Sequence, residues 1–410
     1  MSLPVRLQIL LIALLFTMAS SFLQVSPSVN SDYLIHSLAI DEDLLLKLTT
    51  LYFLSYAILQ IPSGYILDTK GIERIFPISI FIVFIGSVIY WLSSDSLLIG
   101  FSRLIIGAGC STAYITSLFI ATRYFSKAVI PLLISFAEIA GGIGNYLAEN
   151  SYLYILDNFG WDTANLIIIF ILLALLIYSI IVLKISNRQI SKIESTKVKS
   201  FSEMISTMKS MFKSSTNIAL FAYSFFTWGI IMGFAGYWAK NYYVTMHHYS
   251  KEFALSLPEI YWLSFLVAAL AVGTYVKTIN QAKKYIVLLA IVGIIAYAIM
   301  ITPILFSYSL LAFITVLCGI SASGVILAFF IIQHLVSNEE KGLAISMNNF
   351  FIVLGGMIGQ LSFSEAISLN FNKLFILTTG INSFFYSGIV MLTIWATLAL
   401  IAILFVIKKI

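Results

Sequence analysis

Apolar residues run in long stretches along this sequence, separated by short polar connections. Each stretch approaches the roughly 20 residues that an α-helix needs to cross the hydrocarbon core of a bilayer. The first stretch is too long for a signal peptide and no clear cleavage site follows it, so we interpret it as a retained helix. The pattern predicts twelve membrane-spanning helices, at about residues 7–27, 44–67, 75–92, 97–122, 129–147, 164–183, 217–239, 260–276, 285–302, 310–332, 343–363 and 386–407.

A polar, Ser- and Lys-rich loop between the sixth and seventh stretches divides the chain into halves. We predict an N-terminal six-helix bundle at residues 1–184, a cytoplasmic linker at 185–216 and a C-terminal six-helix bundle at 217–410. The middle of the linker, 201–212, has a weak amphipathic pattern. It is therefore either a helix on the membrane surface or a solvated connection.

The two halves repeat one another. Arg103 stands four residues before Gly107 in the fourth span, as Thr315 stands before Gly319 in the tenth. A lysine fourteen residues before a Gly-Gly pair recurs in the fifth and eleventh spans. Such duplication is typical of transporters built from two pseudo-symmetric bundles, so we expect an all-α membrane protein of that architecture.

Composition excludes several classes of protein. The chain has 410 residues, of which 60% are hydrophobic and 10% charged, whereas soluble domains average about 45–50% and 25%. This excludes an ordinary soluble enzyme, a disordered chain and a secreted disulfide scaffold. Cys110 and Cys318 both lie in apolar stretches, and no nucleotide-binding loop, zinc-protease motif or nucleophile elbow is present. We therefore expect no catalytic activity, cofactor or metal.

The basic residues indicate topology. With the N-terminus in the cytoplasm, only Lys47, Lys240, Lys251 and Lys373 of the 23 Lys and Arg residues fall in outer loops, and Arg103 falls within a span. All the others fall on the cytoplasmic side, as the positive-inside rule requires. Both termini are therefore expected in the cytoplasm, and the net charge of +5 does not indicate nucleic-acid binding.

The connection between the second and third spans carries a motif, Gly64-Tyr-Ile-Leu-Asp68-Thr-Lys70-Gly71-Ile-Glu73-Arg74. It resembles the signature G-x-x-x-D-x-x-G-R-[RK] of the major facilitator superfamily, except that two residues separate the second glycine from the arginine. The segment from Arg103 to Gly109 resembles the fourth-span pattern of the same superfamily.

This resemblance implies a gate at the cytoplasmic ends of the helices. Asp68 is expected to approach the start of the eleventh span near Gly342, with Gly64 and Gly71 permitting a tight turn. Arg74 and Arg123 are further members of this expected gate. A carboxylate gains free energy at the positive end of a helix. The alternative is that the motif is a solvated turn.

A narrower resemblance covers residues 103–160, which contain "GAGCS", "ATRYF", "GGIG" and a final "GW". This segment is similar to the phagosomal amino-acid and nutrient permeases of intracellular bacteria. The Ile-, Lys- and Asn-rich composition fits an AT-rich bacterial genome. The resemblance implies a multi-pass protein of the bacterial inner membrane that imports amino acids or nucleosides.

Two ionisable residues lie deep within predicted spans. Arg103 is about six residues, or ~9 Å, below the outer end of its helix, and Glu138 is about ten residues, or ~15 Å, from the inner end of the next. Such groups are costly in a membrane unless paired or hydrated, so they are candidate functional residues. One hypothesis is that Arg103 binds a substrate carboxylate while Glu138 binds an amine or carries the coupling proton. The alternative is a buried Arg–Glu pair that holds two helices together or only gates.

Further polar residues lie at helical spacing on neighbouring spans. In the first half the candidates for substrate binding are Tyr56, Gln60 and Asn145, because polar stripes on several helices can line one cavity. In the second half they are Trp228 and Asn349. Close helix packing is the alternative for the small residues beside them, and an interhelical hydrogen bond is the alternative for Asn349.

Taken together, the sequence predicts a secondary transporter that moves a small polar nutrient, an amino acid or another carboxylate, by alternating access and proton symport. An exporter of drugs or siderophores is the alternative within transport. A membrane-embedded enzyme or a receptor would need a catalytic cluster or an appended soluble domain, and the sequence has neither. The expected partners are the substrate, protons and membrane lipid, and the chain is expected to work as a monomer.

Overall fold

The computed structural model describes residues 2–190, 201–247, 249–302, 306–368 and 385–409. In these ranges all regular secondary structure is helical. Eleven stretches are long and apolar enough to cross a membrane, and one of them, Lys127–Ser186, has 60 residues and contains both the fifth and the sixth predicted spans. Each of the twelve predicted spans therefore overlaps one of these stretches over most of its length, and the all-α membrane architecture is confirmed.

The helices form two compact units. Unit 1 comprises Met1–Ser126, Phe136–Thr207 and Val336–Met347, and unit 2 comprises Lys127–Ser135, Met208–Leu335 and Asn348–Ile410. Each unit thus includes one short segment from the opposite half of the sequence. The boundaries at 184 and 217 stay a prediction, because residues 191–200 of the polar loop lie outside the described residues.

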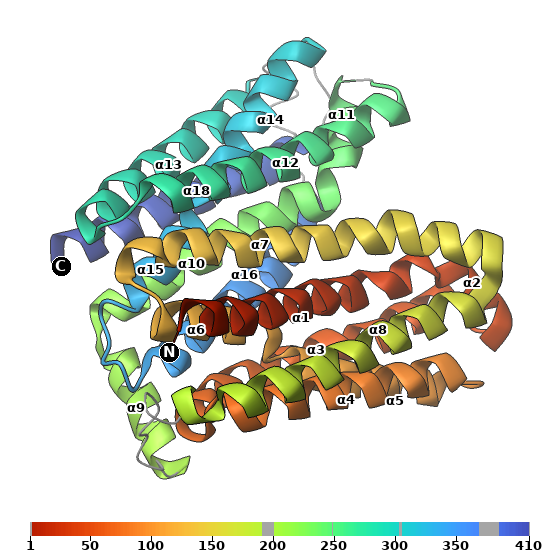
Figure 1. Cartoon of the computed structure of the whole chain (residues 1–410). Helices are drawn as coiled ribbons and strands as arrows, with labels where there is room; N and C mark the ends of the chain where they lie inside the picture. Colours follow the sequence, from red (N-terminus) through yellow and green to blue (C-terminus); the bar gives the residue numbers. More distant parts are fainter. Residues whose placement is uncertain (1, 191–200, 248, 303–305, 369–384, 410) are drawn as a thin grey trace. The chain divides into compact units, whose positions relative to one another are not determined.

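Unit 1 is a bundle of long helices (Figure 1). Within it, α4 packs against α5 and α8, α3 packs against α5, and α1 packs against α6 and α8. The fourth span consists of two helices, which meet at Ser111 and Thr112. The helices are α1 (Leu3–Val29), α2 (Ser31–Leu38), α3 (Glu42–Lys70), α4 (Ile72–Leu92), α5 (Ser96–Cys110), α6 (Ala113–Tyr124), α7 (Ile130–Tyr146), the single π-helical segment η2 (Leu147–Tyr152) and α8 (Leu153–Ile190).

The chain reverses between the fifth and sixth spans at Gly160. This residue has φ 80° and ψ 175°, a conformation that is essentially restricted to glycine. Two indole N–H groups hold the turn to the end of α4. The Trp91 indole donates to the Asp162 carboxylate at 2.9 Å, and the Trp161 indole donates to the backbone carbonyl of Trp91 at 3.2 Å.

Unit 2 is the second bundle. In it α10 packs against α18, α12 against α14, and α13 against both α14 and α18. The tenth span is again two helices, which meet at Ser323. The helices are the single-turn η1 (Lys127–Val129), α10 (Ser215–Gly233), the π-helical segment η3 (Phe234–Trp238), α11 (Ala239–His247), α12 (Lys251–Tyr275), α13 (Ile279–Met300), α14 (Tyr308–Ala322), α15 (Gly324–Ile332), α16 (Lys341–Ser368) and α18 (Phe385–Lys409).

The middle of the polar loop is also helical, as α9 (Phe201–Lys213). Its apolar face is buried through Met204 and Met211, so the helical interpretation of this segment is confirmed. Its position on a membrane surface stays a prediction.

The internal repeat is visible in how the helices pack. A Cβ atom on Gly107 would collide with the Tyr52 carbonyl and the Ser55 hydroxyl, and one on Gly319 would collide with the Tyr261 carbonyl and the Ser264 hydroxyl. The fourth and tenth spans therefore approach their neighbours through a glycine in the same way. Each span also breaks four residues after that glycine, at Ser111 and Ser323.

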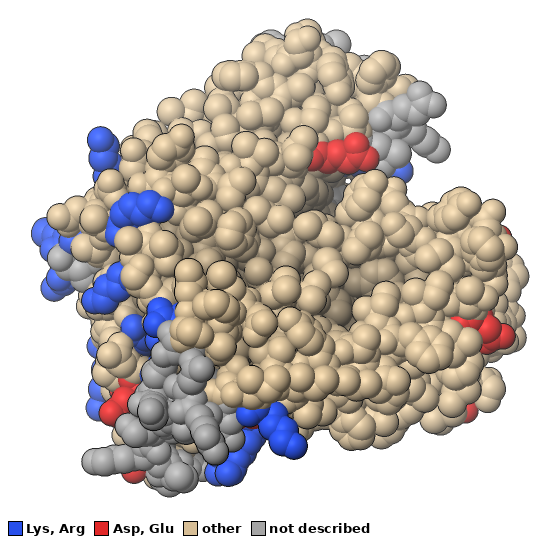
Figure 2. Space-filling view, in the orientation of Figure 1, with Lys and Arg blue, Asp and Glu red and all other residues tan. Residues whose placement is uncertain are grey.

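Charged residues are separated from apolar surface within each unit. On the face shown in Figure 2, Lys and Arg side chains gather at one end of each unit's helices and are rare along their flanks. In unit 2 this end includes Lys408 and Lys409 in the last turn of α18. The flanks instead expose large apolar side chains, such as Phe81 on α4 and Ile401 on α18. This distribution is typical of a bundle whose flanks contact lipid.

Candidate functional site

A polar contact in unit 1 joins α6 to α7. The hydroxyl of Tyr114, in the first turn of α6, donates a hydrogen bond to Oε1 of Glu138 on α7. Both side chains are only partly buried. The Glu138 carboxylate therefore has a neutral hydrogen-bond donor and remains accessible, which leaves it able to accept a proton or an ammonium group.

The break between α5 and α6 is held by α3. The amide of Gln60 donates to the Ser111 carbonyl at 3.3 Å, and the hydroxyls of Ser63 and Ser111 lie 2.8 Å apart. Gln60 is fully buried. It thus satisfies a carbonyl at a helix end, which is a structural task. The residue that it contacts, Ser111, lies three residues before Tyr114 in the fourth span.

Tyr56 lies one turn before Gln60 on α3. Its ring stacks on that of Tyr52 with centroids 5.7 Å apart, and it is partly exposed. Asn145 on α7 is exposed and makes no side-chain hydrogen bond to the residues that the structure describes. The structure therefore brings Gln60 and Glu138 against the fourth span, at Ser111 and Tyr114, and places Tyr56 one turn from Gln60.

Arg103 does not pair with Glu138. Its side chain is 1% exposed, its Nη1 donates to the Leu23 carbonyl at 2.8 Å, and its guanidinium lies over the Tyr52 ring, 4.7 Å from the centroid. The alternative, a buried Arg–Glu pair that holds two helices together, is therefore not what the structure shows. The binding role of each residue stays a prediction.

Sequence reasoning missed a buried polar network beside Arg103. The Tyr90 hydroxyl donates to Oδ1 of Asn30 at 3.1 Å, the Asn30 amide donates to the Tyr152 hydroxyl at 3.0 Å, and that hydroxyl donates to Oδ1 of Asn165 at 3.4 Å. These residues come from four separate parts of the chain. No helical period links them, so the pattern of the sequence carries no signal for the network.

The candidates of the second half lie in unit 2. Trp228 on α10 packs edge-on against Phe265, with centroids 6.2 Å apart, and is partly exposed. Asn349 on α16 is buried. An interhelical hydrogen bond of the kind suggested for Asn349 is made by its neighbour Asn348, whose Oδ1 accepts from the Ser224 hydroxyl at 2.8 Å.

Two of the predicted gate residues, Gly64 and Asp68, lie against the start of α16. The Asp68 carboxylate accepts from the backbone N–H groups of Gly342 at 3.1 Å and Leu343 at 2.9 Å. Gly64 lies against the Gly342 carbonyl, where a Cβ atom would collide. The approach of Asp68 to Gly342 that the family resemblance implied is therefore present, and its role in gating stays a prediction.

The other gate candidates differ in position. Gly71 has φ 73° and ends α3, so it permits the tight turn as expected. The Arg123 guanidinium donates to the carbonyl of Asn338, just before α16. Arg74 is exposed.

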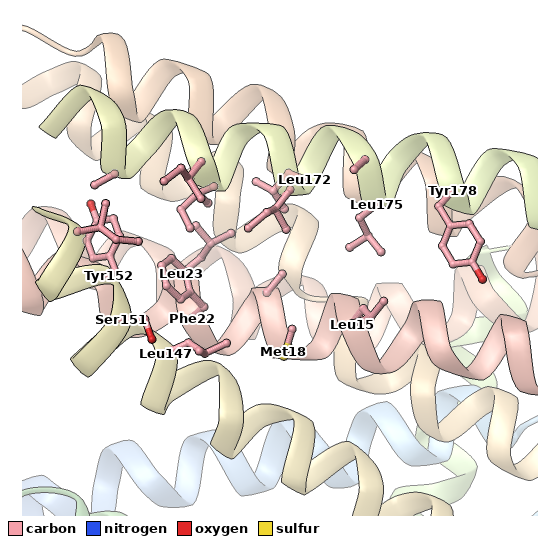
Figure 3. A pocket seen from close by; sticks show the side chains of 17 residues that line it. Leu15, Met18, Phe22, Leu23, Leu147, Ser151, Tyr152, Leu172, Leu175 and Tyr178 are labelled. Atoms are coloured by element: carbon pink, nitrogen blue, oxygen red, sulfur yellow. The ribbon is translucent and has the colours of Figure 1, made fainter. Parts of the chain in front are cut away.

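An apolar cavity of about 530 Å³ lies elsewhere in unit 1 (Figure 3). It is bounded by α1, η2 and α8, with side chains such as Leu15, Phe22 and Leu175 pointing into it. None of the predicted substrate-binding residues lines it. Its lining suits hydrocarbon rather than a small polar nutrient.

Comparisons with known proteins agree with this architecture. A family profile described as Major Facilitator Superfamily matches residues 9–360. No curated protein matches the sequence significantly. The following solved structures are only 11–14% identical to this chain, so their similarity shows the fold alone.

The first of these is the proton:xylose symporter XylE, with a TM-score of 0.68, 14% identity and coverage of 98% of this chain and 95% of that chain. A bacterial homologue of the iron transporter ferroportin, in its outward-facing state, has a TM-score of 0.77, 11% identity and coverage of 98% and 99%. The human organic anion transporter MFSD10 has a TM-score of 0.65, 11% identity and coverage of 98% and 99%.

Proposed function

We propose, from the premise that this chain belongs to the major facilitator superfamily, that it carries a small polar nutrient, an amino acid or another carboxylate, together with a proton. Proteins of this superfamily are transporters and not enzymes, and the chain is a multi-pass membrane transporter. The proposal concerns the substrate, the coupling ion and the residues that bind them. Alternating access between the two sides of the membrane is the expected mechanism.

The observation that carries the proposal is the hydrogen bond from Tyr114 to Glu138. A carboxylate within a membrane span is costly unless it is paired or hydrated, and such residues commonly mark substrate or proton pathways. Tyr114 is a neutral partner, so Glu138 keeps its capacity to bind a cation. The proposed cation is a proton or the ammonium group of an amino acid.

Tyr56 and Gln60 are the proposed polar neighbours of this site on α3. Asn145, Trp228 and Asn349 remain proposed substrate-binding residues, on the helical spacing of the sequence. The gathering of basic side chains at one end of each unit supports a cytoplasmic position for both termini (Figure 2). We place the protein in a bacterial inner membrane, working as a monomer.

The test is uptake of labelled amino acids and organic acids into proteoliposomes with an imposed pH gradient. The wild-type protein should accumulate its substrate when the outside is acidic, and Glu138→Gln should abolish that accumulation. Asp157→Asn changes an exposed carboxylate of the same unit and is the matched control, with uptake expected to stay normal. Unchanged gradient-driven uptake in Glu138→Gln would eliminate the proton role. Substrate that moves only outward against an opposing gradient would instead support the exporter alternative.

A further inference from the structure

The guanidinium of Arg103 lacks a full set of partners. Within the described residues its Nε and Nη2 atoms have no hydrogen-bond partner. Its two contacts, the Leu23 carbonyl and the Tyr52 ring, are neutral. An arginine is always charged, and a buried charge is normally paired because its desolvation costs several kcal/mol. This buried cation therefore calls for an anion.

A small cavity adjoins this side chain. Arg103 lines it together with Ser87 and Tyr90 of α4 and Asn165 of α8, and its volume is about 10 Å³. The Ser87 hydroxyl is also buried and has no hydrogen-bond partner in the part of the chain that the structure describes. Three unsatisfied polar atoms thus belong to residues that line this cavity. They are Nε and Nη2 of Arg103, which can only donate, and the Ser87 hydroxyl.

The unsatisfied nitrogens of Arg103 can only donate, and the Ser87 hydroxyl is able to donate as well. The Asn165 amide already donates to the Trp161 carbonyl at 2.9 Å, and its oxygen accepts from Tyr152. The Tyr90 hydroxyl already donates to Asn30. A ligand for Arg103 and Ser87 is therefore one that accepts hydrogen bonds and carries negative charge.

The size of the cavity selects among anions. A volume of this order admits roughly one water-sized body. A nutrient that carries a carboxylate on a carbon skeleton does not fit, and a monatomic ion is the anion closest to that size. In a low-dielectric interior the attraction between such an anion and the guanidinium is far stronger than in water.

We propose that the cavity beside Arg103 binds one chloride ion, held by Nε and Nη2 of Arg103 and by the hydroxyl of Ser87. The ion neutralises the arginine and joins α4 to α5, while the Leu23 carbonyl and the Tyr52 ring join α5 to α1 and α3. The site is separate from Glu138, so this proposal does not depend on the proposed substrate or on proton coupling.

The test is thermal unfolding of the purified full-length protein, followed by tryptophan fluorescence at constant ionic strength. Chloride is titrated against gluconate, which is too large for the cavity. We expect the unfolding temperature to rise saturably with chloride, and bromide to act similarly. Acetate should give no such rise. The absence of a chloride-dependent rise, or an equal rise with acetate, would overturn the proposal.

Two variants assign the site. Arg103→Gln should remove the chloride dependence, and Ser87→Ala should raise the chloride concentration at half-effect at least several-fold. Ser179→Ala is the control, because Ser179 is equally buried in unit 1 but its hydroxyl donates to the Leu176 carbonyl. If Arg103→Gln does not fold, Ser87→Ala still decides the matter. A half-effect concentration in Ser87→Ala equal to that of the control would refute the site, and anomalous scattering from bromide at this position would confirm it.

Discussion

Asp68 caps the start of α16 at Gly342, a residue 274 positions further along the chain. The carboxylate accepts from two backbone N–H groups that an isolated helix start would leave unsatisfied. Hydrogen bonds to charged groups contribute about 1.5–3 kcal/mol. We predict that Asp68→Ala slows substrate uptake by about tenfold or more, since each 1.4 kcal/mol corresponds to a factor of ten. Initial uptake rates in proteoliposomes measure this.

A control separates this effect from the general loss of a helix cap. Asp95 caps α5 in the same chemical way, accepting from Leu98 N at 2.9 Å, but it is exposed and local. Asp95→Ala should therefore leave the uptake rate within about twofold of wild type, because an exposed cap contributes only about 1 kcal/mol to stability. Normal rates in Asp68→Ala would refute the gating role.

Two glycines make corresponding close contacts, one in each unit. Gly64 lies against Gly342 and Ser346. Gly273 lies against Leu132 and Pro131, and a Cβ atom on Gly273 would be 2.7 Å from the Leu132 Cα and 2.8 Å from the Pro131 carbonyl oxygen. We predict that Gly64→Ala and Gly273→Ala each lower the unfolding temperature and the uptake rate, because overpacking costs about 1–3 kcal/mol. Thermal unfolding and uptake of the same preparations measure both effects.

Gly236 provides the comparison. A Cβ atom there would meet the Met232 sulfur at 3.2 Å, the end of a flexible side chain that can move aside. Gly236→Ala should therefore behave like wild type. Similar unfolding temperatures for all three variants would show that the contacts of Gly64 and Gly273 are not tight in solution.

Tyr114 offers a test of the Glu138 site that leaves the carboxylate in place. Tyr114→Phe removes the hydroxyl that donates to Glu138 but keeps the ring. We predict that proton-driven uptake falls several-fold, because the lost bond to a charged group is worth about 1.5–3 kcal/mol. Tyr154→Phe changes an exposed tyrosine of the same unit and should have no effect. Equal uptake by the two variants would contradict a role for this hydrogen bond.

Asp68 shows what the sequence predicts well. Its position four residues after Gly64 and three before Gly71 matches a family signature, and the resemblance to that family implies its approach to Gly342. The twelve spans are predictable for a different reason. The length of each apolar stretch is set by the thickness of the bilayer, and the helical hydrogen bonds that satisfy the backbone there leave little choice of structure.

Arg103 shows where such reasoning ends. Its spacing from Tyr114 suggests one common face, but α5 ends at Cys110 and α6 begins at Ala113. A helical period cannot be extended across a break, and a long arginine side chain can reach several neighbours. Arg103 thus contacts α1 and α3 while Tyr114 contacts α7. The cavity beside Ser87 depends equally on side-chain directions that no residue pattern encodes.

Substitutions at Gly160 and Ala39 are predicted to shift the unfolding temperature in opposite directions. Gly160 has φ 80° and ψ 175°, whereas Ala39 has φ 50° and ψ 44° at the end of α2 and is exposed. Side chains destabilise both conformations, by about 1–3 kcal/mol at the first and about 1–2 kcal/mol at the second. Gly160→Ala should therefore lower the unfolding temperature, and Ala39→Gly should raise it. The greater backbone freedom of glycine in the unfolded chain offsets part of the gain at Ala39, so the rise should be smaller than the fall. Thermal unfolding of both variants in one detergent measures the two shifts, and shifts of the same sign would contradict the backbone conformations on which they rest.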